Sequence, residues 1–171
     1  MSDTVQTPAE EKKAKAPKHH PVRMQKIPAH LEGAAALEKL CFSNPWSAKS
    51  MELLTNEGIG VGYLLTVPAA PGSEPAVTAY GGMLITVDEG QITNIAVHPD
   101  YRRKGLGAAI VRSLLRHAKD ARLESVSLEV RVSNTAAIKL YEQFGFVEMG
   151  RRKGFYQKPT EDALVMVCKI K

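Results

Sequence analysis

The sequence contains few cysteines, few aromatic residues and no long apolar run. Cys41 and Cys168 are its two cysteines, and neither belongs to a CxxC pair. This argues against a zinc site and a disulfide framework, so we expect no metal. No run of about eighteen apolar residues occurs, so no membrane-spanning helix is predicted. The N-terminal segment is polar and shows no secretory signal pattern, so the sequence predicts a cytoplasmic protein without membrane contacts.

The remaining composition is typical of one globular domain. Of the 171 residues, 44% are hydrophobic and 24% are charged, and these values lie close to globular averages. Residues 1–21 contain four lysines and three prolines but almost no large apolar side chain, so burial cannot offset the entropy cost of ordering them. We therefore expect a flexible basic tail over residues 1–21 and a single monomeric domain over residues 22–171.

Positive charge is concentrated in one segment. Residues 98–122 contain seven Lys or Arg and two Asp, a net charge of +5 that equals the formal net charge of the whole chain. Such a local field favours a polyanionic ligand, either nucleic acid or a phosphate-rich cofactor. Aromatic residues make up only 6% of the chain, and within this segment there is only Tyr101 to stack on a base. We therefore expect no direct contact with nucleic acid.

The periodicity of apolar residues predicts an α+β domain. A helix is expected over 30–42, with an apolar stripe of Leu31, Ala34, Ala35, Leu37, Leu40 and Cys41. Further helices are expected from Ser47 to about residue 56, after Gly105, and over 134–144. Strands are expected at 62–67, 77–87, 91–97, 125–132, 146–152 and 163–170, the last two joined by a loop of about ten residues. With a short extended piece at 23–27, these elements predict a mixed sheet flanked by helices.

The strongest local signal is the loop Arg102-Arg103-Lys104-Gly105-Leu106-Gly107-Ala108, which follows a predicted strand and opens a helix. Glycines expose backbone N–H groups, and a helix N-terminus adds unpaired donors and partial positive charge, so this loop suits a pyrophosphate. The loop lacks the third glycine of a dinucleotide-binding fingerprint and the GK[ST] of a P-loop.

This loop resembles the Arg/Gln-x-x-Gly-x-Gly/Ala signature of the GNAT superfamily of N-acetyltransferases. The resemblance covers about residues 22–171 and points to the bacterial ribosomal-protein alanine N-acetyltransferases through Asn44–Ser47, Leu128–Arg131, Ser133-Asn134, Ala136–Glu142, Gly145-Phe146, Arg151-Arg152, Phe155-Tyr156 and Glu161–Ala163. It implies the GNAT fold, a mixed, mostly antiparallel sheet of six to seven strands with about four helices. It also implies acetyl-coenzyme A as co-substrate and, as acceptor, the N-terminal alanine of a ribosomal protein, small-subunit protein eighteen.

The resemblance further implies roles for individual residues. The pyrophosphate of acetyl-coenzyme A would be bound by Arg102, Arg103, Lys104, Gly105, Leu106, Gly107 and Ala108, and the pantetheine arm by the backbone of Ile95, Ala96 and Val97. Asn134 would contact coenzyme A, although from its position alone it could simply cap its helix. Trp46 and Tyr156 are expected to contact the acceptor.

Two ionisable residues are candidates for the chemistry. An α-amino group has a pKa of about 8 and must lose a proton before it attacks, and Glu129 is by resemblance the general base. Tyr141 is by resemblance the acid that protonates the leaving thiolate. From the residues alone, Glu129 could instead be a surface carboxylate paired with Arg131, and Tyr141 a core side chain. His98, beyond a strand end, and His117, on the solvent side of a helix, are weaker candidates for the base.

The identity of the acceptor is the least constrained part of the hypothesis. Gly154-Phe155-Tyr156 stands where the resembled enzymes usually have an asparagine and two tyrosines. The acceptor could therefore be another protein N-terminus, a lysine or a small amine. A rival of another class is a non-catalytic RNA- or ribosome-binding module whose basic segment contacts phosphates.

Overall fold

The computed structural model describes residues 22–23, 28–67 and 75–171. The predicted basic tail and most of the loop between residues 68 and 75 lie outside these ranges. The elements are, in chain order, β1 (Val22–Arg23), α1 (Pro28–Cys41), α2 (Ala48–Met51), the 3-10 helix η1 (Glu52–Thr55), β2 (Gly60–Val67), β3 (Ala76–Thr86), β4 (Glu89–Val97), the 3-10 helix η2 (Pro99–Tyr101), α3 (Leu106–Asp120), β5 (Ser125–Arg131), α4 (Thr135–Gln143), β6 (Val147–Tyr156) and β7 (Glu161–Lys169).

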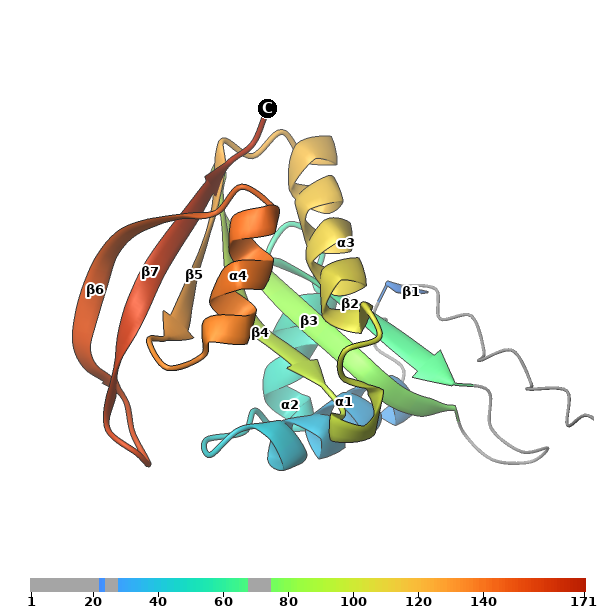
Figure 1. Ribbon diagram of the computed structural model, residues 1–171. Coiled ribbons are helices and arrows are strands. Elements are labelled where there is room, and N and C mark those ends of the chain that lie inside the picture. The colour runs from blue at the N-terminus through green and yellow to red at the C-terminus, as the bar shows by residue number, and fades with distance from the viewer. Residues whose placement is uncertain (1–21, 24–27, 68–74) are drawn as a thin grey trace, which may run out of the picture.

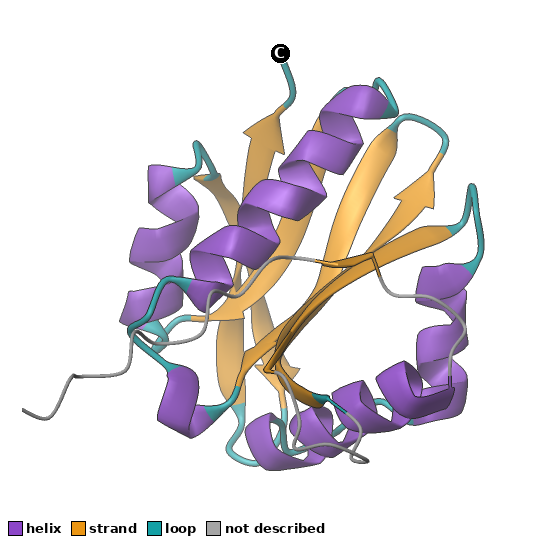
Figure 2. Ribbon diagram, turned by 90° about the vertical axis from the view of Figure 1, so that its right-hand side faces the viewer, coloured by secondary structure: helices purple, strands orange, loops and turns teal. Residues whose placement is uncertain are grey.

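The sheet separates two hydrophobic clusters, each covered by helices (Figures 1 and 2). Successive strand residues point to opposite faces, and Ala79 and Tyr80 of β3 accordingly belong to different clusters. The first cluster lies under α3 and α4, where Ile110 and Leu114 are fully buried. The second lies under α1, α2 and η1 and includes the fully buried Leu54.

The strands follow the order β1-β2-β3-β4-β5-β7-β6. β1 to β4 form an antiparallel meander, and β5, β7 and β6 form a second antiparallel unit. The parallel pair β4–β5 joins the two units through four aligned residue pairs, from Glu89↔Ser125 to Ile92↔Leu128. Figure 1 shows β4 and β5 diverging after this short contact.

The predicted α+β architecture is confirmed, with seven strands and four α-helices in the described residues. Most boundaries differ from the prediction by one or two residues, and two differences are larger. The second helix is one short α-helix continued by η1, and the final hairpin has a turn over residues 157–160 because β6 extends to Tyr156. The part of β6 that was predicted as loop, residues 153–156, begins with Lys153 and Gly154, and such residues are common on an edge strand. None of the helices in the described ranges combines the length and apolarity needed to cross a membrane.

Candidate functional site

The free edge of β4 forms the first part of the candidate site. Ile95, Ala96 and Val97 remain paired with β3, but the alignment with β5 ends at Ile92. The register with β3 shifts at Thr93, whose hydroxyl donates to a β3 carbonyl at 3.2 Å, so a bulge lies where β4 leaves β5. Within the described chain, the β5 side of residues 95–97 has no strand partner and is available to an added extended segment.

The loop after β4 places an uncapped helix N-terminus beside this edge. Gly105 is the N-cap residue of α3 with a φ of +78°, and no side chain of the described residues caps the helix there. The first-turn N–H groups of Leu106, Gly107 and Ala108 thus have no capping acceptor, an arrangement that binds phosphate. A Cβ on Gly107 would lie 3.4 Å from Leu140 Cδ2, an ordinary contact, so folding alone does not require glycine there.

Three exposed cations surround this helix start. Arg102 Nε donates to the Val97 carbonyl at 3.2 Å, and Lys104 Nζ donates to the Asp100 carbonyl at 3.0 Å. Arg103 is exposed between them. The structure therefore brings all of the predicted pyrophosphate-binding residues together and places them next to the strand predicted to bind the pantetheine arm.

Glu129 lies on β5, one residue beyond the last aligned pair of β4 and β5. Its side chain is only 16% exposed, and one carboxylate oxygen pairs with Arg152 Nη1 of β6 at 2.8 Å. The other oxygen accepts a hydrogen bond from Gln91 Nε2 of β4 at 3.3 Å. The alternative pairing of Glu129 with Arg131 is wrong, because Arg131 pairs with Glu161 at 3.0 Å.

Tyr141 of α4 and Tyr156 of β6 are neighbours on the Glu129 side of the sheet. The Tyr156 hydroxyl donates to the Glu129 carbonyl at 3.0 Å, and burial, reinforced by the nearby Glu129 charge, raises the pKa of Tyr156 to about 12. Tyr141 is 9% exposed and packs against Phe146 with ring centroids 5.8 Å apart. Burial and the neighbouring Tyr156 raise the pKa of Tyr141 to about 12. Tyr156 therefore lies between the predicted base and the predicted acid.

Arg131 fixes the β6–β7 turn beside these tyrosines. Its guanidinium donates to the carbonyls of Gln157 and Pro159 at 3.3 Å and 3.1 Å as well as to Glu161. The same guanidinium lies 4.4 Å from the centroid of the Tyr156 ring. Arg131 therefore sets the position of the turn and of the aromatic ring together.

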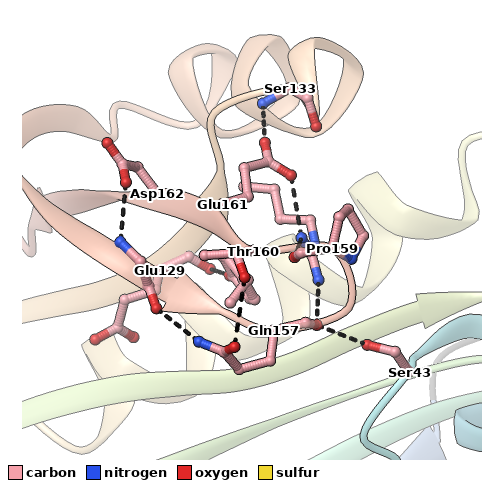
Figure 3. A network of polar contacts seen from close by, with 11 residues as sticks. Ser43, Glu129, Ser133, Gln157, Pro159, Thr160, Glu161 and Asp162 are labelled. Carbon is pink, nitrogen blue, oxygen red and sulfur yellow. Dashed lines mark hydrogen bonds and ion pairs between the residues drawn. The ribbon is translucent and has the colours of Figure 1, made fainter.

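The same network reaches two further segments (Figure 3). The backbone N–H of Ser133, after β5, donates to Glu161 at 2.7 Å, and the contacts with Ser133 and Arg131 hold the pKa of Glu161 below its usual value. The Ser43 hydroxyl, between α1 and α2, donates to the Gln157 carbonyl at 3.4 Å. The α1–α2 connection and the β6–β7 turn are thus in contact.

The remaining predicted binding residues lie at the ends of helices. Asn134 caps α4, because its Oδ1 accepts from the Ala137 N–H at 3.2 Å. The capping interpretation is confirmed, and a contact with coenzyme A stays a prediction. Trp46 precedes α2 and packs partly buried against the second cluster. Its backbone N–H donates to Glu38 at 2.9 Å.

The two histidines considered as rival bases lie elsewhere. His98 follows β4, where its Nδ1 accepts from the Asp100 N–H at 3.3 Å. The predicted solvent position of His117 is wrong: its ring packs edge-on against Tyr63 at 6.4 Å, and burial lowers its pKa. Neither imidazole has a contact with Glu129 among those of the described residues.

Sequence reasoning assigned no role to three residues of this region: Glu38, Gln91 and Arg152, the last of which was named only as part of the resemblance. Glu38 had a detectable signal, because it stands seven residues after Leu31 and therefore on the apolar face of α1. It is fully buried, whereas Leu40, predicted in the apolar stripe, is 53% exposed. Arg152 and Gln91 gave no such signal, because only the sheet order brings β4 and β6 to Glu129.

Comparisons with known proteins agree with this geometry. The profile of the acetyltransferase (GNAT) family matches residues 31–146. The [ribosomal protein bS18]-alanine N-acetyltransferase of Escherichia coli K12 is 35% identical over 145 residues, 82% of this chain and 91% of its own. A Bacillus subtilis protein provisionally given the same name is 38% identical over 132 residues, 76% of this chain and 83% of its own. The crystal structure of the Escherichia coli enzyme superposes with a TM-score of 0.73 and 31% identity, covering 88% of this chain and 94% of that one.

Proposed function

The chain belongs to the acetyltransferase (GNAT) family, and on that premise we propose that it acetylates the α-amino group of a protein N-terminus, in the first place the N-terminal alanine of ribosomal protein bS18. The observation that carries this proposal is the meeting of Glu129, Tyr156 and Tyr141 beside the free edge of β4. The named acceptor of relatives similar over most of their length supports the choice of substrate.

Acetyl-coenzyme A would bind along β4 and the start of α3. The pantetheine arm would lie as an added strand beside Ile95, Ala96 and Val97, whose backbone N–H groups could polarise the thioester carbonyl. The pyrophosphate would meet the first-turn N–H groups of α3 and the three exposed cations before it. Donor binding in this arrangement needs backbone donors and positive charge, both of which the described loop supplies.

The reaction is a direct transfer without an acetylated enzyme. Glu129 accepts a proton from the acceptor ammonium, directly or through water, and the neutral nitrogen attacks the thioester carbon. As the tetrahedral intermediate collapses, the carbon–sulfur bond breaks and the coenzyme A thiolate leaves with a proton from Tyr141. The nitrogen releases its second excess proton to solvent, and solvent reprotonates Tyr141. A phenol of ordinary pKa, about 10, already carries its proton at physiological pH, and burial raises the pKa of Tyr141 to about 12, so the proton stays on Tyr141 until the thiolate develops beside it.

Acceptor selection would depend on the two segments that meet through Ser43 and Gln157. Trp46 follows the first segment and Tyr156 precedes the second, and both side chains are only partly buried, so each could contact an N-terminal peptide. Family membership argues against the alternative of a non-catalytic RNA- or ribosome-binding module. Other protein N-termini, lysines and small amines remain as outcomes of an acceptor panel.

The decisive assay measures release of free coenzyme A thiol with a peptide that copies the N-terminus of bS18. We expect turnover with this peptide and much less with a lysine side chain or a small amine. Absence of thiol release above background with the peptide contradicts the substrate assignment.

Variants separate donor binding from chemistry. Glu129→Gln should lower kcat by roughly a hundredfold or more with little change in affinity for acetyl-coenzyme A. Gly107→Glu should weaken that affinity, because it places a carboxylate at the phosphate-binding helix start. Glu148→Gln is the matched control: Glu148 also pairs with an arginine of β6, at 3.0 Å, but is 45% exposed and is not among the partners of Glu129 in the described residues. Normal turnover of Glu129→Gln across pH 6 to 9 contradicts the assignment of the base.

A further inference from the structure

A fully buried carboxylate lies outside the proposed catalytic machinery. Glu38 of α1 is 0% exposed, and three donors from three different segments point at it. The Tyr80 hydroxyl of β3 and Asn94 Nδ2 of β4, the latter at 2.6 Å, donate to Oε1. The backbone N–H of Trp46 donates to Oε2 at 2.9 Å. Among the described residues no cation pairs with Glu38, so these three donors are the polar partners of its side chain.

Such a group is costly to bury. A carboxylate loses its hydration in the interior, and hydrogen bonds restore only part of that loss. An apolar side chain of the same size would pack on this face of α1 without the penalty. The presence of a carboxylate is therefore explained by the segments that it joins rather than by the stability of the helix.

One of these segments is the half of β4 that has left β5. Asn94 stands two residues beyond the last β4–β5 pair and directly before Ile95, at the bulge of Thr93. One turn further along α1, the Cys41 thiol contacts the Val97 carbonyl at 3.6 Å. α1 thus contacts the diverging half of β4 at both ends of the predicted pantetheine-binding stretch.

The other segment leads to the acceptor side. The hydrogen bond from the Trp46 N–H fixes the backbone just before α2. It thereby fixes the Cα of Trp46, whose side chain is predicted to bind the acceptor. Tyr80 lies within β3, where it is aligned with Ala96 of the predicted pantetheine-binding stretch, and its ring is fully buried in the second cluster. The carboxylate of Glu38 therefore contacts one donor-side residue, one acceptor-side residue and one core residue.

We propose that Glu38 is a positioning residue that holds the donor-binding edge of β4 and the acceptor-binding Trp46 segment in one fixed arrangement. This inference rests on the proposed function for the roles of residues 95–97 and of Trp46. It assigns Glu38 no contact with substrate. Its effect on the reaction passes through Asn94 on one side and through Trp46 on the other.

Two variants each remove one side-chain donor, and a third removes the carboxylate and with it all three contacts. Asn94→Leu keeps the approximate size of the side chain but removes the donor from β4, so the Kd for acetyl-coenzyme A should rise about tenfold, which corresponds to ~1.4 kcal/mol. Tyr80→Phe removes a hydroxyl that contacts Glu38 and Asn94 but leaves the hydrogen bond from Asn94 to Glu38 in place, so the Kd for acetyl-coenzyme A and the KM for the peptide should change much less than the Kd changes in Asn94→Leu. Glu38→Met removes the carboxylate, so both constants should rise.

Calorimetric titration with acetyl-coenzyme A and steady-state kinetics with the bS18 peptide give these constants, and thermal unfolding confirms that each variant is folded at the assay temperature. Equal Kd values for Asn94→Leu and Tyr80→Phe overturn the proposal, as do losses that merely follow the folded fraction. If Glu38→Met does not fold, the comparison of Asn94→Leu with Tyr80→Phe decides. A wild-type chain that does not bind acetyl-coenzyme A contradicts the proposed function instead, so the two failures are distinguishable.

Discussion

Two buried tyrosines should respond in opposite ways to the loss of a hydroxyl group. Tyr141 is 9% exposed and Tyr80 is 0% exposed, and each packs in a hydrophobic cluster. Their hydroxyls differ: that of Tyr80 donates to the Glu38 carboxylate, whereas that of Tyr141 has no hydrogen-bond partner among the described residues. Tyr141→Phe and Tyr80→Phe are therefore a matched pair that separates chemistry from stability.

The expected magnitudes follow from these contacts. A hydrogen bond to a charged group contributes about 1.5–3 kcal/mol, so Tyr80→Phe should lower the free energy of unfolding by that amount. In a domain of this size, such a loss lowers Tm by about 4–10 °C. Tyr141→Phe removes an unpaired hydroxyl and should change stability by less than about 1 kcal/mol. If Tyr141 protonates the thiolate, its loss should lower kcat by roughly a hundredfold, or about 2.7 kcal/mol of transition-state stabilisation.

The assay combines thermal unfolding with steady-state turnover of the bS18 peptide at saturating acetyl-coenzyme A. We expect a low Tm and normal kcat for Tyr80→Phe, and a normal Tm and low kcat for Tyr141→Phe. Turnover of Tyr141→Phe within a factor of three of the wild type would refute the assignment of Tyr141 as the acid. A parallel fall of Tm and kcat in Tyr141→Phe would show that its hydroxyl is structural.

Three further predictions concern stability and local order. The pKa of Tyr141 is raised from about 10 in the unfolded chain to about 12 in the folded protein. The stability that results is complete below about pH 10 and is lost, by on the order of 2 kcal/mol, as pH rises toward 12. Between pH 9 and pH 11, the free energy of unfolding in urea should therefore fall less for Tyr141→Phe than for the wild type. Gly82→Ala would place a Cβ in steric conflict with Leu54 Cδ1. This overpacking should lower the free energy of unfolding, measured by thermal unfolding, by about 1–3 kcal/mol. The double variant with Leu54→Val should recover part of that loss. Arg131→Lys keeps the charge but cannot reach both turn carbonyls, so amide hydrogen exchange of residues 157–160 should accelerate, and an unchanged exchange rate would contradict the role of this arginine.

Periodicity and one loop motif were sufficient to predict much of this fold. The stripe of α3 and the alternation of β5 are local patterns, and each element has the predicted type. The geometry of the glycine loop is also determined by local sequence, because Gly105 adopts a positive φ at the start of a helix. These features depend on neighbours within a few residues, which a sequence displays directly.

The partners of the site residues depend on strand order, which the sequence does not display. Arg131 was the nearest cation on the same face as Glu129, yet the ion pair goes to Arg152 on β6, across the intervening β7. The extent of β6 was underestimated for a related reason, because an edge strand tolerates the glycines and charges that elsewhere indicate a loop. Glu38 was overlooked because helical periodicity was read for apolar residues only.

The short parallel contact between β4 and β5 has a consequence for how the domain unfolds. It joins the two antiparallel units through four aligned pairs, whereas β3 and β4 align through eight pairs and β5 and β7 through seven. Apart from the contact of the two-residue β1, this junction is the shortest pairing in the sheet and should open before the longer ones. A ligand bound between the diverging strands would contact both units and should therefore slow the unfolding that begins at this junction.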